Sequence, residues 1–514
     1  MISAFYLPLG LEEGLETSLQ RFGPAHDALE LHLPVVQADD LLRWIEVLRE
    51  ARESNLSRRP VAEIIRSLDR VVRRFLDPAD SARREAIASL ARSGRWTAAM
   101  VEHSLDDAFQ PVARGGLAKW VSSELGSTEV LDRPVAGSAG VLRRAHGPEW
   151  MLQIYAGNVP SLPIWPMFSA LLLKSALLAK TSAQEPLLAP LLARTIAEVD
   201  QGLGACLAAV WWKGGTNDLD RAALSRAPAV LAFGAGETVA NLARLAPQGA
   251  KLILHGPKVS VGYVERRALH YAALRGLVAR AALDISLYDQ QGCLSPHIFY
   301  VERRGEVPPA KFAEALALAL EARAQTLPRG AVAAAESARV QLYRAQARFE
   351  VAGLAAFGFR TEGSSAKETT SVLESPTGTT WTVVLEDRAR FEPGPELRTV
   401  RVSAVDGPEE LARLLGDSVH AIEALGLEAR APESARLSAY FAGLGIPRIA
   451  PIGQLQRPSP LGTHGGVRRL APFVTWSTVE EPASRIAKPG RPESRPTAKG
   501  RGTSGRGPKR RPPR

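Results

Sequence analysis

The feature that most constrains the fold is a series of short apolar runs between Trp150 and Gly256. Segments rich in Leu, Ala and Arg separate the five runs, which are Met151–Tyr155, Ala176–Lys180, Cys206–Trp212, Ala229–Phe233 and Lys251–Leu254. Continuous apolar strands that are joined through helices indicate a parallel sheet covered on both faces. Because such sheets bind dinucleotides beyond the carboxyl ends of their strands, we predict a dinucleotide site in this region.

Helical periodicity dominates the chain before this sheet. Between Leu41 and about Gly126, apolar residues recur every three or four positions among charged ones, which is typical of amphipathic helices. The segment Asp77–Asp80 interrupts this pattern, and a new helix is predicted to start at Ser81. This part of the chain shows no site chemistry of its own.

The sequence after Gly256 mixes both patterns again. Helices are expected around Ala310–Ala324 and Gly330–Ala347, and strands at Ile298–Val301, Trp381–Leu385 and Thr399–Val402. A second α/β domain is the simplest explanation. At 514 residues the chain is too long for one core, so two or three domains with a cleft between them are expected.

The net charge of +10 is confined to the C-terminal end. Residues 485–514 hold eleven Lys and Arg residues and one acid, Glu493, while the rest of the chain is formally neutral. From Glu481 onward there is no aromatic residue, and Arg, Lys, Pro, Gly, Ser and Thr predominate. Such a composition cannot bury enough apolar surface to fold, so we predict a disordered basic tail.

Features of the sequence favour a cytoplasmic protein. The first twenty residues contain three Glu and no Lys or Arg, so no secretory signal is expected. The most apolar stretch, Met167–Ala179, is interrupted by Lys174 and is shorter than the roughly 20 residues that span a bilayer. Two cysteines cannot form a disulfide framework, and a reducing compartment fits them best.

The two thiols lie in different sequence surroundings. Cys206 falls within the apolar strand region and is assigned to the core. Cys293 follows Gly292 in a turn-like stretch before the strand Ile298–Val301. Loops at strand ends often display reactive side chains, and a glycine lets the backbone approach a substrate. Taken alone, Cys293 fits either a reactive thiol or an ordinary half-buried cysteine, and the second is the commoner case.

Two further turns have features of a binding site. Asn158 stands in the Gly/Pro turn Tyr155–Pro160 after a strand, where its amide could donate to an oxyanion or simply satisfy the turn. The segment Val230–Val239 has the pattern of a strand, a glycine-containing turn and a helix start, which suits a pyrophosphate. It lacks the full Rossmann glycine pattern and is weak by itself. No spaced cluster of His, Cys, Asp or Glu predicts a metal site.

Several segments, taken in order, resemble the aldehyde dehydrogenase superfamily, and more closely the LuxC-type acyl-CoA reductases of the bacterial luminescence fatty-acid-reductase complex. The likeness covers roughly residues 60–480, and it depends on the order of the segments because none is decisive alone. The segments are Trp96–Met100, Ala156–Pro160, Leu172–Ala176 with Lys180–Ser182, Trp212–Gly215, Phe233–Val239, His255–Ser260, Asp289–His297 and Thr463–Gly466.

This resemblance implies an aldehyde-dehydrogenase-like α/β fold with two parallel-sheet domains. The expected division is a helical N-terminal region at 1–130, an NADPH-binding α/β domain at 131–256, a catalytic α/β domain with the nucleophilic cysteine at 257–446, a C-terminal segment at 447–484 that packs back on the body, and the disordered basic tail at 485–514. Superfamily members are commonly dimers or tetramers, so a homo-oligomer is expected.

The resemblance also implies roles for particular residues. Cys293 is the expected nucleophile and Asn158 the expected oxyanion donor. Lys180 and Ser182 should approach the adenosine ribose or its 2′-phosphate, where a cation suits NADPH, although NADH stays open. The residues expected to border the pyrophosphate or nicotinamide end are Gly234, Gly236 and Glu237.

One departure from the aldehyde-oxidising members bears on the reaction. They carry a Glu before a Gly-Gly-Lys turn, and aligning their Lys with Lys258 puts Leu254 in its place. Without that base, water should deacylate the enzyme slowly, so the acyl group persists for hydride attack. His297 is a candidate to protonate the departing thiol or to lower the thiolate pKa, or it is structural. Less weight falls on His255 and His464.

We therefore expect an NADPH-dependent reductase that converts a medium- or long-chain acyl-CoA to the aldehyde through a thioacyl intermediate on Cys293. An acyl-protein thioester is another expected donor, and a partner protein could transfer the acyl group. A short-chain acylating aldehyde dehydrogenase that uses NADH would share Cys293 and Asn158 and stays an alternative. A non-catalytic binding protein, tethered to polyanions by its basic tail, is the alternative from a different class.

Overall fold

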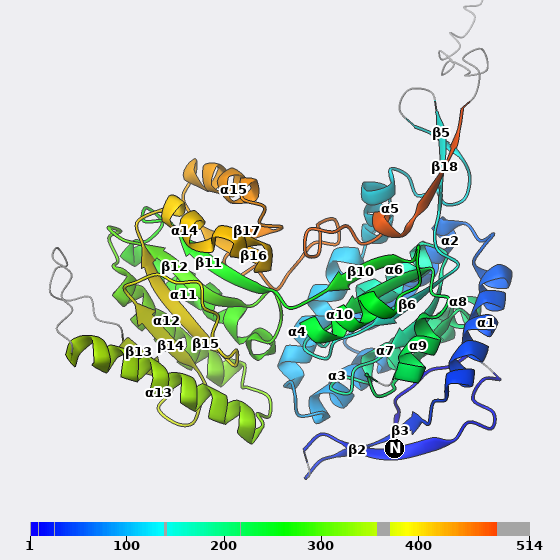
Figure 1. The fold of residues 1–514 in the computed structure, drawn as a ribbon, viewed down its shortest axis with the longest axis horizontal. Helices are drawn as coiled ribbons and strands as arrows, with labels where there is room; N and C mark the ends of the chain where they lie inside the picture. Colours follow the sequence, from blue (N-terminus) through cyan, green and yellow to red (C-terminus); the bar gives the residue numbers. More distant parts are fainter. Residues whose placement is uncertain are drawn as a thin grey trace, which may run out of the picture.

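A computed structural model describes residues 2–8, 10–24, 26–137, 141–215, 217–356 and 371–480. The chain forms two lobes (Figure 1). A five-stranded sheet and the N-terminal helices make up the first lobe, and a seven-stranded sheet with its helices makes up the second. The basic tail at 485–514 lies outside the described residues, so its disorder stays a prediction.

The five-stranded sheet lies where the apolar runs predicted it. Its strands are parallel and follow the order β10-β9-β6-β7-β8. Their bounds are Trp150–Ile154 for β6, Ala176–Lys180 for β7, Leu207–Val210 for β8, Ala229–Phe233 for β9 and Lys251–His255 for β10. All five predicted strands are thus confirmed to within two residues. In this order the winding reverses between β6 and β9, the place where doubly wound sheets bind ligands.

Helices connect these strands and cover the sheet (Figure 1). They are α6 (Ile164–Leu172), α7 (Leu188–Val199), α8 (Gln201–Gly204), α9 (Asn217–Leu224) and α10 (Gly236–Leu245). Every residue of β6, β7, β8 and β9 is buried. Burial on both faces explains why the sequence shows continuous apolar runs here instead of alternation.

Residues 2–34 differ from the helical region that was expected over 1–130. They contain a three-stranded sheet in the order β1-β3-β2, with bounds Ile2–Ser3, Leu29–Pro34 and Thr17–Phe22. In β3, Leu29, Leu31 and Leu33 are buried and alternate with polar residues. This two-residue period is typical of a strand with one buried face, but a segment of only six residues is too short for the period to stand out in the sequence.

Helices fill the chain from residue 38 to 125. They are α1 (Ala38–Asn55), α2 (Val61–Leu76), α3 (Ser81–Arg92), α4 (Ala98–Phe109) and α5 (Gly116–Leu125). The predicted helix start at Ser81 is confirmed, because Asp80 caps α3 by accepting a hydrogen bond from the N–H of Ala82. One hydrophobic core runs through these helices and the five-stranded sheet, so the two form a single lobe.

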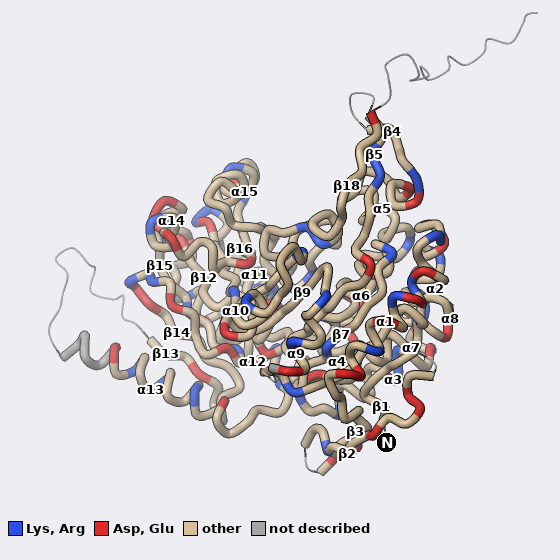
Figure 2. The backbone as a smooth tube through the Cα atoms, turned by 45° about the vertical axis from the view of Figure 1, so that its right-hand side comes forward, with Lys and Arg blue, Asp and Glu red and all other residues tan. Residues whose placement is uncertain are grey.

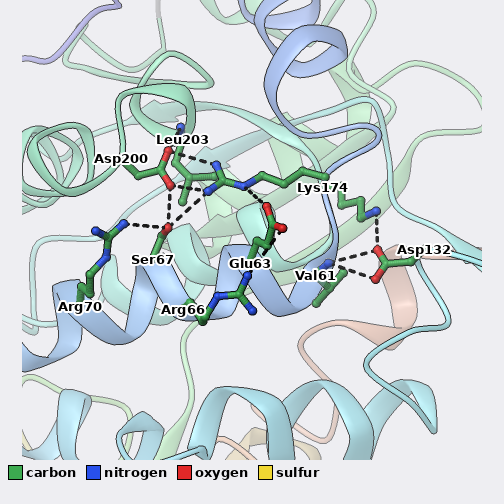
Figure 3. A network of polar contacts seen from close by, with 10 residues as sticks. Val61, Glu63, Arg66, Ser67, Arg70, Asp132, Lys174, Asp200 and Leu203 are labelled. Atoms are coloured by element: carbon green, nitrogen blue, oxygen red, sulfur yellow. Dashed lines mark hydrogen bonds and ion pairs between the residues drawn. The ribbon is translucent and has the colours of Figure 1, made fainter.

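Polar contacts also join the N-terminal helices to the sheet (Figure 3). Asp200, which follows α7, accepts hydrogen bonds from Arg59 and Ser67 at 2.6 Å each. Lys174 lies 2.6 Å from Asp132, which also accepts a hydrogen bond from the first N–H of α2 at 3.1 Å. These contacts attach the first turns of α2 to Asp200, which follows α7, and to Asp132, which is also bound by Lys174 before β7.

The second lobe is built on a seven-stranded sheet in the order β13-β14-β15-β12-β11-β16-β17. All pairs are parallel except β13 with β14. The strands are β11 (Val259–Val264), β12 (Pro296–Glu302), β13 (Ser371–Glu374), β14 (Thr382–Glu386), β15 (Thr399–Val405), β16 (Ile422–Glu428) and β17 (Ile449–Pro451). The three strands predicted for this part of the chain are confirmed as β12, β14 and β15.

Helices of the second lobe are α11 (Tyr271–Ser286), α12 (Pro309–Thr326), α13 (Ala334–Ala356), α14 (Pro408–Leu415) and α15 (Glu433–Gly443). The two predicted helices correspond to α12 and α13. With two largely parallel sheets and their covering helices, the expected α/β fold class is confirmed. Charges of both signs are interspersed over the two lobes (Figure 2), in keeping with a formally neutral body.

The C-terminal segment crosses back to the first lobe. Leu470 and Phe473 are buried in the core of that lobe. Beyond them, β18 (Thr475–Val479) pairs with β5 (Leu142–His146), which pairs with β4 (Val135–Ala136), and this antiparallel ribbon extends away from the lobe (Figure 1). Among the described residues, no helix is long and apolar enough to cross a bilayer.

Candidate active site

A cavity opens where the two lobes meet, and Cys293 lies in its wall. The cavity measures about 1130 Å³, including the space that opens to solvent. The first lobe contributes side chains from α4, α6, β9 and β10, and the second contributes the Cys293 loop and β16. A large part of the wall is apolar and consists of Leu162, Trp165, Leu231, Phe233, Ile253, Leu294 and Phe473.

The backbone before Cys293 adopts a rare conformation. Tyr288, Asp289 and Gln290 have positive φ angles of 54°, 51° and 65°, in a region that costs energy for residues other than glycine. A second run of three non-glycine residues with positive φ precedes β15 and comprises Glu396, Leu397 and Arg398. One strained turn therefore precedes Cys293 and the other precedes β15. Both must be held in this conformation by contacts with the surrounding residues.

Each strained turn supports the other. Arg398 donates from Nε to Oδ1 of Asp289 at 2.8 Å, and the two side chains are 1% and 4% exposed. The N–H of Leu397 donates to the carbonyl of Asp289 at 3.0 Å, and the N–H of Thr399 donates to the side chain of Gln290 at 2.7 Å. This buried network fixes the turn that leads to Cys293.

Asn158 stands directly against the Cys293 loop. Its Nδ2 donates to the carbonyl of Gln291 at 2.9 Å, and the amide has a second N–H to offer. A Cβ atom on Gly292 would lie 3.3 Å from Cγ2 of Val159, so the two turns are in close contact. The structure thus places Asn158 against the loop that carries Cys293, at the carboxyl end of β6 where the sheet winding reverses, while Asn158 itself is not among the residues of the cavity wall.

Burial is the main influence on the thiol of Cys293. The residue is only partly exposed, and burial raises its pKa to about 12. The negative charge of Glu423 raises the pKa further, while Lys258 and Arg448 oppose this rise. In the free protein the thiol is therefore protonated at neutral pH, and attack on an acyl group requires removal of that proton.

Lys180 ends β7 next to the turn that carries Asn158. It is buried, and its Nζ lies 5.3 Å from the centre of the Trp212 ring. Burial lowers the pKa of Lys180, and Asp220 partly opposes that shift. A buried cation at the edge of the sheet fits a phosphate better than a neutral hydroxyl.

Ser182 lies against the same turn. A Cβ atom on Gly157 would be 2.8 Å from Oγ of Ser182 and 2.7 Å from Cβ of Gln184, so only glycine allows this close approach. The Ser182 hydroxyl accepts a hydrogen bond from the N–H of Gln184 at 3.1 Å. The predicted ribose-side residues and the predicted oxyanion donor therefore occupy neighbouring loops of one sheet edge.

The turn after β9 exposes the N-terminus of α10. Gly236 is the first residue of this helix, and no side chain of the described residues caps it. Gly236 and Glu237 are exposed, while Gly234 packs near Thr238. Free N–H groups at a helix start suit a pyrophosphate. Together with Lys180, this edge of the sheet fits a dinucleotide.

His297 does not line the cavity. It lies in β12 and is only 5% exposed. Burial lowers its pKa to about 4, and a hydrogen bond with the backbone of Gly394 partly opposes this shift. The predicted role of His297 as a proton donor to the thiol gains no support from this position.

Two other histidines do line the cavity. Strand β10 turns Ile253 and His255 toward it, whereas Leu254 packs against the core of the first lobe. The ring of His255 stacks on Phe233 with centres 4.9 Å apart, and the ring of His464 lies 4.1 Å from His255. Mainly because of burial, the pKa of His255 is lowered to about 4, and that of His464 is lowered well below its usual value. Both rings are therefore neutral near pH 7.

Sequence reasoning missed the charged residues of the cavity, above all Glu423. This residue is 4% exposed, and its Oε1 accepts a hydrogen bond from the N–H of Gly465 at 2.7 Å. A signal was available, because Glu423 lies among the buried apolar residues of β16, and burial of a charge inside a strand is costly unless the charge is paired or hydrogen-bonded. Among the described residues, no group of three or more His, Cys, Asp or Glu could hold a metal ion.

Known proteins resemble this chain both in sequence and in fold. The family model described as acyl-CoA reductase (LuxC) matches residues 56–476. A long-chain acyl-protein thioester reductase of Photorhabdus luminescens is 26% identical over 89% of both chains, and one of Aliivibrio fischeri is 24% identical over 73% of both.

The fold also matches solved structures of aldehyde dehydrogenases. A benzaldehyde dehydrogenase of Corynebacterium glutamicum superimposes with a TM-score of 0.65 at 14% identity, covering 91% of this chain and 96% of its own. The lactaldehyde dehydrogenase of Escherichia coli gives a TM-score of 0.64 at 16% identity, covering 90% of this chain and 95% of its own. The chain therefore belongs to the acyl-CoA reductase (LuxC) family and is an oxidoreductase with the aldehyde dehydrogenase fold.

Proposed function

We propose that this protein reduces a medium- or long-chain acyl thioester to the aldehyde, with Cys293 as the residue that carries the acyl group. The observation behind this proposal is the position of Cys293. It lies in the wall of a largely apolar cavity, beside Asn158 and at the reversal point of a dinucleotide-type sheet. One place thus offers a nucleophile, room for a hydrocarbon chain and access for a hydride donor.

The reaction has two stages in which the same residues act. In the first, the thiolate of Cys293 attacks the thioester carbonyl, Asn158 donates to the oxyanion, and the donor thiol departs. NADPH, when bound, supplies the hydride that reduces the thioacyl group. Asn158 then holds the second oxyanion until the C–S bond breaks and aldehyde leaves, so one oxyanion site serves both stages.

NADPH is proposed over NADH because of Lys180. This buried cation lies at the sheet edge where the second β-strand of a dinucleotide-binding unit ends, and a 2′-phosphate would neutralise it. We expect Lys180→Met to raise KM for NADPH about 10- to 100-fold while it changes KM for NADH little, since one charge-assisted contact is worth roughly 1.5–3 kcal/mol. Initial rates with both nucleotides test this, and equal effects on the two would contradict it.

The cavity favours a long acyl group over a short one. Much of its wall is apolar, and those apolar side chains, Leu162, Trp165 and Leu294 among them, would contact a hydrocarbon chain. The donor is proposed to be acyl-CoA or an acyl-protein thioester, the second because the similar proteins are named for it. A panel of acyl-CoA chain lengths should show rates that rise with length, and a preference for acetyl-CoA would favour the short-chain alternative.

The proposal also includes a cytoplasmic location, a homo-oligomeric state and a partner protein that passes on acyl groups. The basic tail is proposed to be an accessory that contacts polyanions. Deletion of residues 485–514 should leave thioester reduction intact and remove polyanion binding, whereas loss of reduction would show that the tail belongs to the enzyme.

Covalent labelling gives the direct test of the proposed intermediate. Incubation with radiolabelled acyl-CoA in the absence of NADPH should label the peptide that contains Cys293, and later addition of NADPH should release the label as aldehyde. Cys206→Ala serves as the control and should label normally. Label on Cys206, or release of the label as free fatty acid in the presence of NADPH, would overturn the proposal.

A further inference from the structure

The proposed acyl transfer needs a group that takes the proton from Cys293, and polar side chains from three elements meet beside the cavity. Gly465 is the point where they converge. A Cβ atom on Gly465 would lie 3.5 Å from Oε2 of Glu423, 3.5 Å from Nδ1 of His255 and 3.6 Å from Nζ of Lys258. Glu423 and His255 line the same cavity as Cys293.

These groups differ in their ability to accept a proton from Cys293. His255 and His464 have pKa values lowered by burial, so each is a weaker base than an ordinary imidazole. Lys258 is a cation and has no acceptor to offer. Asp107, another carboxylate in the cavity wall, is already paired with Arg457 at 2.8 Å.

Glu423 is the stronger candidate, because its affinity for protons is increased instead of decreased. Burial raises the pKa of its carboxyl group, while a hydrogen bond from the backbone of Gly465 and the charge of Lys258 partly oppose this rise. Among nearby charges, that of Glu423 has the largest effect on the Cys293 thiol. The carboxylate is therefore close enough to sense the thiol, and it has an increased affinity for protons.

We propose that Glu423 is the base that takes the proton of Cys293 during acyl transfer and returns it to the sulfur of the departing thiol. This inference rests on the proposed function. In the step, the S–H bond of Cys293 breaks and its S–C bond to the acyl group forms. The C–S bond of the donor breaks, and the donor leaves as a neutral thiol with the proton from Glu423. No oxidation or reduction occurs until hydride arrives.

Strand β10 offers no carboxylate for this proton transfer. That strand presents Ile253 and His255 to the cavity, so the base position of the aldehyde-oxidising enzymes is not filled by an acid. Glu423 comes instead from β16 in the second lobe. After acyl transfer its proton has gone to the donor thiol, and when the aldehyde leaves, the thiolate of Cys293 regains a proton from solvent.

Glu423→Gln tests the proposal because the amide keeps an oxygen that can accept from the N–H of Gly465 but takes up no proton. We expect the single-turnover rate of Cys293 acylation by myristoyl-CoA at pH 7 to fall about 100-fold or more. The same substitution removes the negative charge that raises the thiol pKa. Alkylation of Cys293 by iodoacetamide should therefore become faster, and a merely structural role of Glu423 would not separate the two rates in this way.

The pH profile gives a second readout. In the parent enzyme the acylation rate should level off once Glu423 is ionised. In Glu423→Gln it should keep rising with pH, because only the thiolate itself can then react. The charged and titratable groups that face Glu423 are Lys258, His255, Arg448, His464 and Arg469, and all are present in both proteins.

Two further variants complete the test. Glu265→Gln changes a carboxylate that is also 4% exposed but lies outside the cavity wall, so it should leave acylation within threefold of the parent. Glu423→Ala should be slow and regain part of its rate with added formate. Parent-like acylation of Glu423→Gln, with Cys293→Ala still unlabelled, would overturn the base assignment but not the proposed function. Absence of any acyl label on the parent enzyme would overturn both.

Discussion

Cys206 and Cys293 both have a thiol pKa raised to about 12, and burial is the main cause in each case. Cys206 is fully buried, and its thiol donates to the carbonyl of Gly202 at 3.4 Å. Cys293 stands partly exposed in the wall of a large cavity. Since burial raises the pKa of both thiols to a similar level, their difference in reactivity must depend on access and on the groups that surround each thiol.

Those surrounding groups differ in kind. Near Cys206, Arg59 and Asp200 are bound to each other at 2.6 Å, so their charges are already paired and are held within the fold. Near Cys293, the charge of Glu423 is opposed by cations at the cavity, and its carboxyl group lies in the cavity wall. A raised thiol pKa therefore marks burial in general, and of these two settings only the second has an open cavity with a carboxylate in its wall.

Removal of each thiol should give the largest contrast between the two regions. We expect Cys293→Ala to lower thioester reduction by about 10⁴-fold or more, because no other described residue at this position can carry the acyl group. Cys206→Ala should stay within threefold of the parent. NADPH oxidation with a long-chain acyl-CoA measures both, and a large loss from the Cys206 variant with a small one from the Cys293 variant would reverse the comparison.

Alkylation measures access directly and should give the next largest contrast. Reaction at Cys206 must wait for the first lobe to open, so we expect iodoacetamide to modify it roughly 10³-fold more slowly than Cys293 in the folded protein. Below a pKa of about 12, the thiolate fraction of Cys293 rises tenfold per pH unit. Its alkylation should thus be about 100-fold faster at pH 9 than at pH 7. Mass spectrometry of the two peptides provides the measurement, and equal labelling of both in the native protein would contradict the assigned settings.

The same contrast explains which features could be predicted from sequence. Cys206 and its strand were assigned correctly to the core, because burial on both faces leaves a continuous apolar run that is visible locally. The strands of the first sheet and the pairing of Asn158 with the Cys293 loop also followed from ordered segments. The strands depend on neighbours in sequence. The contact of Asn158 joins the end of β6 in one sheet to the loop before β12 in the other, and only the family resemblance implied it.

Other parts of the site depend on contacts that no local pattern encodes. The salt bridge between Asp289 and Arg398 joins residues more than a hundred positions apart, and positive φ angles at non-glycine residues leave no mark in composition. Glu423 reaches the cavity only because β16 lies next to β11 in the second sheet. His297 shows the converse, since a position close in sequence to Cys293 lies outside the cavity wall, and its role in proton transfer stays a prediction.

The activity of Cys293 should depend on the strained turn that precedes it as well as on its place in the cavity wall. Arg398→Lys keeps the charge near Asp289 but loses the fixed guanidinium geometry. We expect kcat to fall about 10- to 100-fold with little change in KM, because a small displacement of the nucleophile has effects of this size.

Arg344→Lys provides the matched control for this substitution. Arg344 is likewise a buried arginine of the second lobe, 2% exposed, but it binds Thr382 and the carbonyl of Gly378 away from the cavity. It should lose comparable thermal stability while kcat stays near the parent value. If both variants lost kcat equally, the effect of Arg398 would be one of general stability and not of positioning.

The smallest predicted effect is on stability, and there the order of the two cysteines should reverse. Cys206→Ala removes a sulfur atom from the fully buried turn just before β8 and leaves the carbonyl of Gly202 without its weak donor. We expect it to lower the free energy of unfolding of the first lobe by about 1–2 kcal/mol. Cys293→Ala removes the same atom next to an existing cavity, where packing is already incomplete, so its cost should stay below about 0.5 kcal/mol. Urea unfolding followed by tryptophan fluorescence compares the two variants. A larger loss for Cys293→Ala would mean that its thiol supports the fold, and access alone would then not explain the difference between the two regions.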